Sequence, residues 1–183
     1  NSIIERIFDG FSMISISTPI FVIAMLLQYF LAFKFGLFSI TSSKGDIASF
    51  ILPAIALSFI NVGDTYILAK SLLSDELRED YILTVRAKGA TKNYAIGRHA
   101  LKKSLPPIIS LMAMQLASFL SGALITENIF SFNGIGNLSI TAIISRDLPL
   151  IQGTALYAAA LIIIFNLISD IVQLIIDKRG VED

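Results

Sequence analysis

Long apolar stretches with few or no charges run through most of this chain. Residues 10–33, 104–126 and 148–169 contain no charged side chain, and residues 47–69 contain a single carboxylate. About twenty apolar residues in a helix cross the roughly 30 Å of hydrocarbon in a bilayer, and a helix satisfies its own backbone there. We therefore predict one all-α domain over residues 1–183, a polytopic transmembrane helical bundle with four spans, at residues 10–33, 47–70, 104–126 and 148–176.

Composition supports a membrane solvent and excludes several other classes. The chain is 55% hydrophobic and 15% charged, with a mean hydropathy of +0.76, which is more apolar side chain than a soluble core of this size can bury. Cysteine is absent and histidine occurs once, so disulfides and a conventional zinc site are excluded. The balanced charge gives no reason to expect nucleic acid. The chain begins at Asn1 without a readable signal peptide, and we expect it to be part of a longer subunit.

Two apolar regions carry helix-breaking residues. Pro19, next to serines and a threonine, predicts a kink within the first span, because proline removes one helical hydrogen bond. Residues 128–145 are uncharged but rich in Asn, Gly and Ser, which favours a loop. A fifth span there would place the basic tail at Lys178 and Arg179 opposite the main basic loop, so four spans fit better.

The basic residues are concentrated between the second and third spans. Of fourteen lysines and arginines, seven lie within residues 74–103, whereas the loops on the other face hold Lys34, Lys44 and Arg146. Short cytoplasmic loops are enriched in Lys and Arg. We therefore expect this segment, which we call the basic loop, to be cytoplasmic together with both ends of the chain.

The basic loop is too long for a simple turn. Ser74, followed by acidic residues, predicts a helix N-cap, and Gly89 predicts a break, so we expect a helix, a glycine break and a second helix. Mixed apolar and basic positions on the second piece favour a helix that lies on a partner. Composition alone leaves open whether the loop is a docking element or a solvated loop that only sets topology.

A motif distinguishes these alternatives. Asp80-Tyr81, Thr84, Arg86-Ala87-Lys88-Gly89, Arg98-His99-Ala100-Leu101 and Leu105-Pro106 resemble the inner-membrane permeases of ATP-binding-cassette importers, in the dipeptide, oligopeptide and nickel branch. A second stretch agrees: it comprises Glu127-Asn128-Ile129-Phe130, Gly134-Ile135-Gly136, Arg146-Asp147, Pro149, Gln152-Gly153 and Asn166-Leu167 with Asp170. It is similar to the permease type usually encoded first of two. Together the motifs cover most of residues 70–179.

The resemblance implies a transport subunit that forms half of a translocation pathway for peptides or nickel or metal chelates. It implies a second homologous permease, two cytoplasmic ATPase subunits and an extracytoplasmic substrate-binding protein as partners, in a bacterial or archaeal inner membrane. The complete subunit would have around six spans. We expect this chain to bind no cofactor, with ATP and Mg used by the ATPases.

The same resemblance assigns roles to particular residues. The coupling segment, residues 80–102, would sit in a cleft of the ATPase, through Asp80, Tyr81, Thr84, Arg86, Ala87, Lys88, Gly89, Arg98, His99 and Leu101. We expect His99 to pack or hydrogen-bond rather than act as a proton switch.

Charges near or inside the spans are candidates for the pathway or its gate. Asp64 in the second span either lines the pathway or pairs with Lys70 or reaches the interface. Glu127, Arg146 and Asp147 either shape an external gate or are ordinary interfacial charges.

Two other functions were weighed. An ion-coupled secondary transporter or channel subunit would use Asp64 and Glu127 as ion-binding carboxylates, but it would not need a basic docking loop. A membrane anchor that recruits a cytoplasmic complex would leave the Asn/Gly-rich segment unexplained. The sequence contains no catalytic constellation and no phosphate-binding glycine loop, so we do not expect an enzyme.

Overall fold

The computed structural model describes residues 3–39 and 47–176, and every regular element in these ranges is helical. This confirms the predicted all-α class. The predicted basic tail with Lys178 and Arg179, and Lys44, lie outside the described residues. The elements in chain order are α1 (Ile3–Ser17), α2 (Ile20–Leu27), η1 (Gln28–Lys34), η2 (Ile47–Phe50), α3 (Ile51–Glu76), α4 (Asp80–Ala87), α5 (Lys92–Ala95), η3 (Ile96–Ala100), α6 (Leu101–Gly122), α7 (Leu124–Ile129), α8 (Ile135–Ser145) and α9 (Leu148–Ile176).

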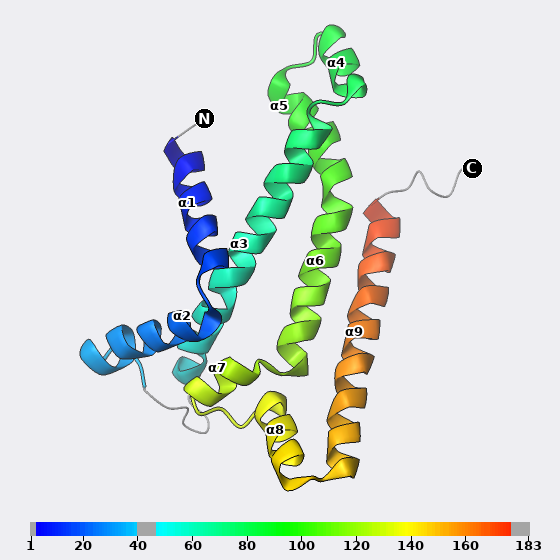
Figure 1. The fold of residues 1–183 in the computed structure, drawn as a ribbon. Helices are drawn as coiled ribbons and strands as arrows, with labels where there is room; N and C mark the ends of the chain where they lie inside the picture. The colour runs from blue at the N-terminus through cyan, green and yellow to red at the C-terminus, as the bar shows by residue number, and fades with distance from the viewer. Residues whose placement is uncertain (1–2, 40–46, 177–183) are drawn as a thin grey trace.

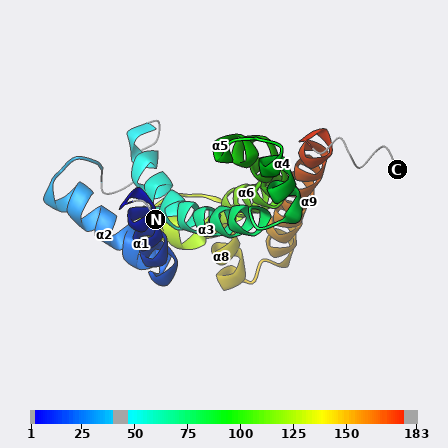
Figure 2. The same ribbon diagram turned by 90° about the horizontal axis from the view of Figure 1, so that it is seen from above.

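The long helices stand side by side. Helix α1 packs on α3, α3 on α6, and α6 on α9, and Figure 2 shows them in one row rather than closed around a centre. The start of α1, the α4–α5 region and the end of α9 lie toward the upper ends of these helices in Figure 1, while α7 and α8 lie at their lower ends. We call these the basic end and the far end.

Three helical segments in the described part of the chain are long and apolar enough to cross a membrane: residues 47–76, 93–122 and 148–176. The last coincides with the fourth predicted span. A fourth crossing is added if α1 and the α2–η1 segment are counted together as one span.

The first predicted span, residues 10–33, is not one kinked helix. The helix is interrupted between Ser17 and Ile20, and the axes of α1 and the α2–η1 segment differ by 106°. Pro19 adopts an extended ψ of 140°. Proline disfavours helical geometry at the preceding residue and offers no amide hydrogen, so the break falls here. The prediction of a single kinked helix was therefore wrong, although the break falls at Pro19 as expected.

Small residues bring α1 and α3 close together. Ser12 and Ser15 are fully buried, and each hydroxyl donates back to a carbonyl of its own helix, at 2.8 and 2.9 Å. A Cβ added to Gly63 on α3 would lie 2.8 Å from the Ser15 Cβ. Small residues of this kind allow helix backbones to approach closely within a membrane.

Polar side chains join the next helices in the row. The Thr65 hydroxyl on α3 donates to Gln115 Oε1 on α6 at 3.4 Å. Between α6 and α9, the Gln173 amide donates to the Ser110 hydroxyl at 2.9 Å, and within α9 it also donates to the Ser169 hydroxyl at 2.9 Å. Hydrogen bonds between neighbouring helices contribute to their association where water is scarce.

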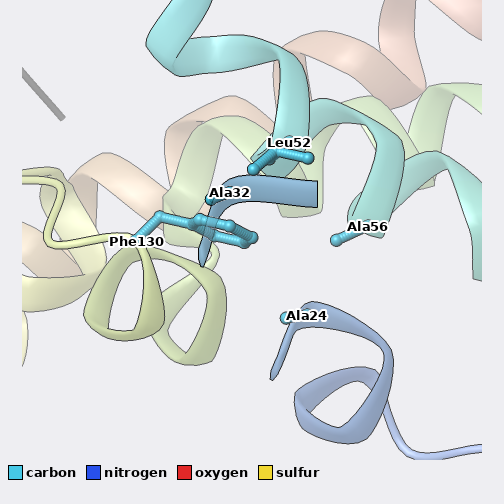
Figure 3. Packing of buried hydrophobic residues seen from close by; sticks show 5 residues of the cluster. All are labelled: Ala24, Ala32, Leu52, Ala56 and Phe130. Atoms are coloured by element: carbon cyan, nitrogen blue, oxygen red, sulfur yellow. The ribbon is translucent and has the colours of Figure 1, made fainter. Parts of the chain in front are cut away.

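At the far end, four elements meet around a small apolar core. Figure 3 shows Ala24 of α2, Ala32 of η1, Leu52 and Ala56 of α3, and Phe130 after α7. All five are buried. Because α2 packs against both α3 and α7, this core keeps the α2–η1 segment turned away from the axis of α1.

Three predicted boundaries differ from the structure. Residues 135–145 form helix α8 instead of a loop. Helix α3 continues to Glu76, so Ser74 lies inside a helix and is not an N-cap. Helix α6 ends at Gly122 and the chain turns at Ala123 (φ −86°, ψ 67°) into α7, so the third predicted span, residues 104–126, crosses a break.

Candidate functional site

The coupling segment is a helical hairpin at the basic end of the molecule. Helix α4 ends at Ala87, a turn contains Gly89, and α5 and η3 continue without interruption into α6. This confirms the predicted order of helix, glycine break and helix. The segment links α3 to α6, the central pair of the row (Figure 1).

The turn depends on Gly89. Its φ is +90°, a conformation that residues with a Cβ rarely adopt. The Gly89 amide donates to the Arg86 carbonyl at 3.0 Å, and the Ala90 amide donates to Val85 at 3.4 Å, which ends α4 with a glycine in the left-handed region. An added Cβ would meet nothing within 4 Å. Glycine is therefore required by the backbone and not by crowding.

The inner face of the hairpin is a small core. Ile82, Ala95 and Ala100 are buried there, and Leu73 and Leu77 from the end of α3 pack against them. This core connects the hairpin directly to the long helix α3. Packed side chains therefore join α4 to the C-terminal end of α3.

Tyr81 braces the same core at its polar edge. Its hydroxyl donates to Glu76 Oε2 at 2.5 Å, and the Lys103 ammonium lies 3.9 Å from the centre of its ring. Partial burial, followed by the bond to Glu76, raises the pKa of the Tyr81 phenol above its usual 10.0. Tyr81 is thus a neutral hydrogen-bond donor that ties α4 to α3 and α6.

The outer face of the hairpin is exposed. Six of the predicted coupling residues are exposed there: Asp80, Thr84, Arg86, Ala87, Lys88 and Gly89. Leu83, next to them, is 56% exposed. Two cations, an uncovered leucine and a small residue at the tip form a surface suited to contact with another protein.

The other predicted coupling residues lie elsewhere. Arg98 and Leu101 are exposed at the start of α6, and His99 is half-buried with its ring edge-on to Tyr94 at 5.9 Å between centroids. The structure therefore exposes six of the ten predicted residues on α4 and the turn after it, packs Tyr81 against the hairpin core, and places three farther along the chain.

At the far end, Glu127 has a specific partner. Its carboxylate accepts the backbone amides of Gly136 at 3.3 Å and Asn137 at 2.7 Å, in the first turn of α8. A carboxylate at a helix N-terminus satisfies free amides and complements the helix dipole. Glu127, predicted as a gate residue or an interfacial charge, is thus the cap of α8.

Glycines make this contact possible. A Cβ on Gly134 would lie 2.5 Å from the Glu127 Cδ, and one on Gly136 would lie 2.9 Å from the Leu124 Cα. Gly122 has a φ of +119°, and its added Cβ would lie 2.5 Å from the Gly136 amide nitrogen. The close approach of α7 to the start of α8 thus explains the spacing of these glycines.

Arg146 and Asp147 form the sharp corner between α8 and α9. Arg146 has a φ of +56° and ends α8 in the left-handed region, while Asp147 Oδ1 accepts the Leu150 amide at 3.1 Å and caps α9. Both are exposed. Their observed contacts are those of a helix–helix corner.

Sequence reasoning missed a charged cluster between α1 and α3. Lys70 Nζ lies 2.5 Å from Asp9 Oδ1 and 3.1 Å from Glu5 Oε1, and the Tyr66 hydroxyl donates to Asp9 at 3.0 Å. Asp9 and Lys70 flank two predicted spans on the same predicted membrane face, which could have indicated the pair. Lys70 therefore pairs with α1 rather than with Asp64, whose carboxylate makes no ion pair or hydrogen bond within the described ranges.

Comparison with known proteins assigns the chain to a family. The model of the family described as "Binding-protein-dependent transport system inner membrane component" matches residues 1–180. The chain is 36% identical over 179 residues to the dipeptide transport system permease protein DppB of Lactococcus lactis subsp. cremoris, a match that covers 98% of this chain and 59% of that protein.

Two further relatives agree. The dipeptide transport system permease protein DppB of Escherichia coli K12 is 38% identical over 73% of this chain and 39% of its own length. The oligopeptide transport system permease protein AppB of Bacillus subtilis is 35% identical over 70% of this chain and 41% of its own length. The chain thus spans between two fifths and three fifths of these relatives, and it belongs to the family of binding-protein-dependent transport system inner membrane components.

Proposed function

We propose that this chain is part of a permease subunit of an ATP-driven peptide importer, and that its coupling segment docks on a cytoplasmic ATPase. The observation that carries the proposal is the two-sided hairpin of residues 80–100. Leu83, Arg86 and Lys88 are exposed to solvent, while the inner face packs on the end of α3 and contacts α6 through Tyr81 and Lys103. A docked partner would push on the outer face and move the two central helices.

The names of the relatives support peptides as the substrate class. The relatives described above are named as dipeptide or oligopeptide permeases, and the chain shares their motifs over most of its length. Nickel or metal chelates are the alternative substrates, because the motifs are common to both groups of importers. Transport assays with peptides and with metal chelates would distinguish the two.

The partners follow from the family. We propose a second homologous permease, two ATPases that use ATP and Mg, and an extracytoplasmic substrate-binding protein, with the basic loop on the cytoplasmic side of a bacterial or archaeal inner membrane. The clustering of Lys and Arg at the basic end supports this orientation. The chain itself would be a transport subunit and not an enzyme.

Glu127, Arg146 and Asp147 stay candidates for an external gate. All three hold the helix ends at the far end, which on this orientation faces the binding protein. A gate there would act through the positions of α7 and α8 rather than through free carboxylates.

The test uses the full-length subunit in its assembled transporter. Leu83→Glu places a charge on the outer face without changing the backbone, and Gly89→Glu adds a charge where the backbone also requires glycine. Ser74→Glu is the matched control, because Ser74 is exposed at the same end on α3 but lies before the hairpin. ATPase stimulation by the binding protein and peptide uptake are measured for all three variants.

We expect both hairpin variants to lose stimulation and uptake while the control keeps them. Pull-down of the ATPases then separates loss of docking from loss of coupling. Full uptake in the Leu83→Glu and Gly89→Glu transporters would refute the docking assignment.

A further inference from the structure

A hollow lies at the C-terminal end of the coupling segment, on the outer surface where η3 passes into α6. It has a volume of about 430 Å³ and is lined by Gly97, Arg98, His99, Leu101, Lys102 and Leu105. Arg98, Leu101 and Lys102 are exposed, and His99 is half-buried. The docking face of α4 does not contribute to it.

The lining is cationic at one end. Arg98, His99 and Lys102 bring basic nitrogens to the hollow, and none of its lining residues is acidic. The neighbouring Lys103 is directed elsewhere, because its ammonium lies over the Tyr81 ring. The two consecutive lysines therefore have different surroundings: Lys103 contacts Tyr81 of the hairpin, and Lys102 lines the hollow.

The other end of the hollow is apolar. Leu101 and Leu105 lie one helical turn apart on the same face as Lys102 and Arg98. Gly97 leaves space beside them, since an added Cβ there would meet nothing within 4 Å. The hollow is therefore amphipathic along the axis of α6.

Its depth fits the boundary between water and hydrocarbon. Lys102 and Lys103 are the last charges before the uncharged residues 104–126, and the apolar crossing segment begins within residues 93–122. Basic side chains at this level lie among lipid headgroups, while a leucine one turn deeper meets acyl chains.

We propose that this hollow binds an anionic phospholipid, with the headgroup phosphate on Arg98, Lys102 and His99 and an acyl chain along Leu101 and Leu105. The two leucines favour a lipid over soluble phosphate, because phosphate has no apolar part that could contact them. Arg98, His99 and Leu101 are among the predicted coupling residues, but the site lies apart from the exposed face of α4. It depends on the proposed function only for the name of the leaflet, which is cytoplasmic on the orientation given above.

The test measures lipid binding by the detergent-purified, fully assembled transporter. Dioleoylphosphatidylglycerol, dioleoylphosphatidylethanolamine and inorganic phosphate are titrated separately, and bound lipid is counted by native mass spectrometry. The variant is Arg98→Gln with Lys102→Gln. The control is Arg6→Gln with Arg78→Gln, which removes the same charge from exposed positions that do not line the hollow.

A basic side chain near a membrane surface contributes about fivefold in affinity for anionic lipid, so the double variant should bind phosphatidylglycerol about 25-fold more weakly. The control should bind it as the unmodified transporter does, and phosphatidylethanolamine should bind weakly to all three. Leu105→Asn should weaken the lipid without affecting inorganic phosphate.

Three results would overturn the proposal. Equal binding of phosphatidylglycerol by variant and control would place the lipid elsewhere. Full competition by inorganic phosphate would show a free-phosphate site. Loss of the ATPases from the Arg98→Gln/Lys102→Gln complex with lipid binding intact would show that a protein covers the hollow. None of these depends on uptake, so failure of the peptide-importer assignment would be seen separately.

Discussion

The Glu127 carboxylate accepts the backbone amide of Asn137 at 2.7 Å, across ten residues of sequence. This bond explains how a segment rich in Asn and Gly forms helix α8 at all. We predict that Glu127→Ala lowers the stability of α8 by about 1–2 kcal/mol, the usual effect of removing a helix cap. Hydrogen exchange of residues 135–145 should accelerate, whereas Asn128→Ala, an exposed neighbour, should leave it nearly unchanged.

Gly134 and Glu127 should be energetically coupled. Gly134→Ala alone places a methyl group 2.5 Å from the Glu127 Cδ, so it should destabilise the fold. In a Glu127→Ala background the obstructing side chain is gone, and the same substitution should cost much less. A double-mutant cycle of thermal unfolding in detergent measures the difference; additive effects would show that the carboxylate is not in place.

Gly122→Ala provides the contrasting case. Its φ of +119° and its approach to the Gly136 backbone cannot be relieved by trimming a side chain. We expect this variant to remain destabilised in the Glu127→Ala background, measured by the same unfolding transition. Rescue there would mean that the α6–α7 turn is more adaptable than its geometry indicates.

The Lys70 cluster should hold α1 on α3. Lys70→Met would leave Asp9 and Glu5 without their shared cation, so the melting temperature should fall. Exchanging the charges, with Lys70→Asp and Asp9→Lys, should restore part of the loss. Lys34→Met, which removes an exposed cation from η1, is the control. If all three variants have the same melting temperature, the ion pairs of Lys70 contribute little to the stability of the fold.

Tyr81 should titrate at unusually high pH. Because its pKa is raised in the folded state, the bond to Glu76 contributes stability below pH 10 and loses it as the pH rises above the raised value. An alkaline spectrophotometric titration should contain a late ionisation of Tyr81, and Tyr81→Phe should reduce the late part of the curve by one tyrosine. An unchanged titration curve in Tyr81→Phe would contradict the assignment.

Local signals in the sequence were sufficient where one residue type decides the structure. The unbroken hydropathy of residues 148–176 coincides with α9, and Gly89 marks a turn that its positive φ requires. The resemblance in the motifs led to the family that the comparisons show. None of these depends on a contact between distant residues.

Tertiary contacts explain what the sequence could not predict. Helix α8 exists because Glu127 reaches across to it, which compensates for weak helix formers. Ser74 is helical because Leu73 and Leu77 on the same turns pack on the hairpin core. The bend at Pro19 is far larger than a proline kink because α2 packs on α3 and α7. Each of these contacts joins residues that no local pattern connects.

Helix α3 reaches from the core around Leu52 to the hairpin core at Leu73 without a proline or a break after Pro53. Twenty-six helical residues measure about 39 Å, so a tilt of about 5° displaces one end by about 3 Å relative to the other. If the proposed docking on α4 displaces the Leu73 end of α3, the Leu52 end beside Phe130 would change position as well, because one unbroken helix joins the two cores.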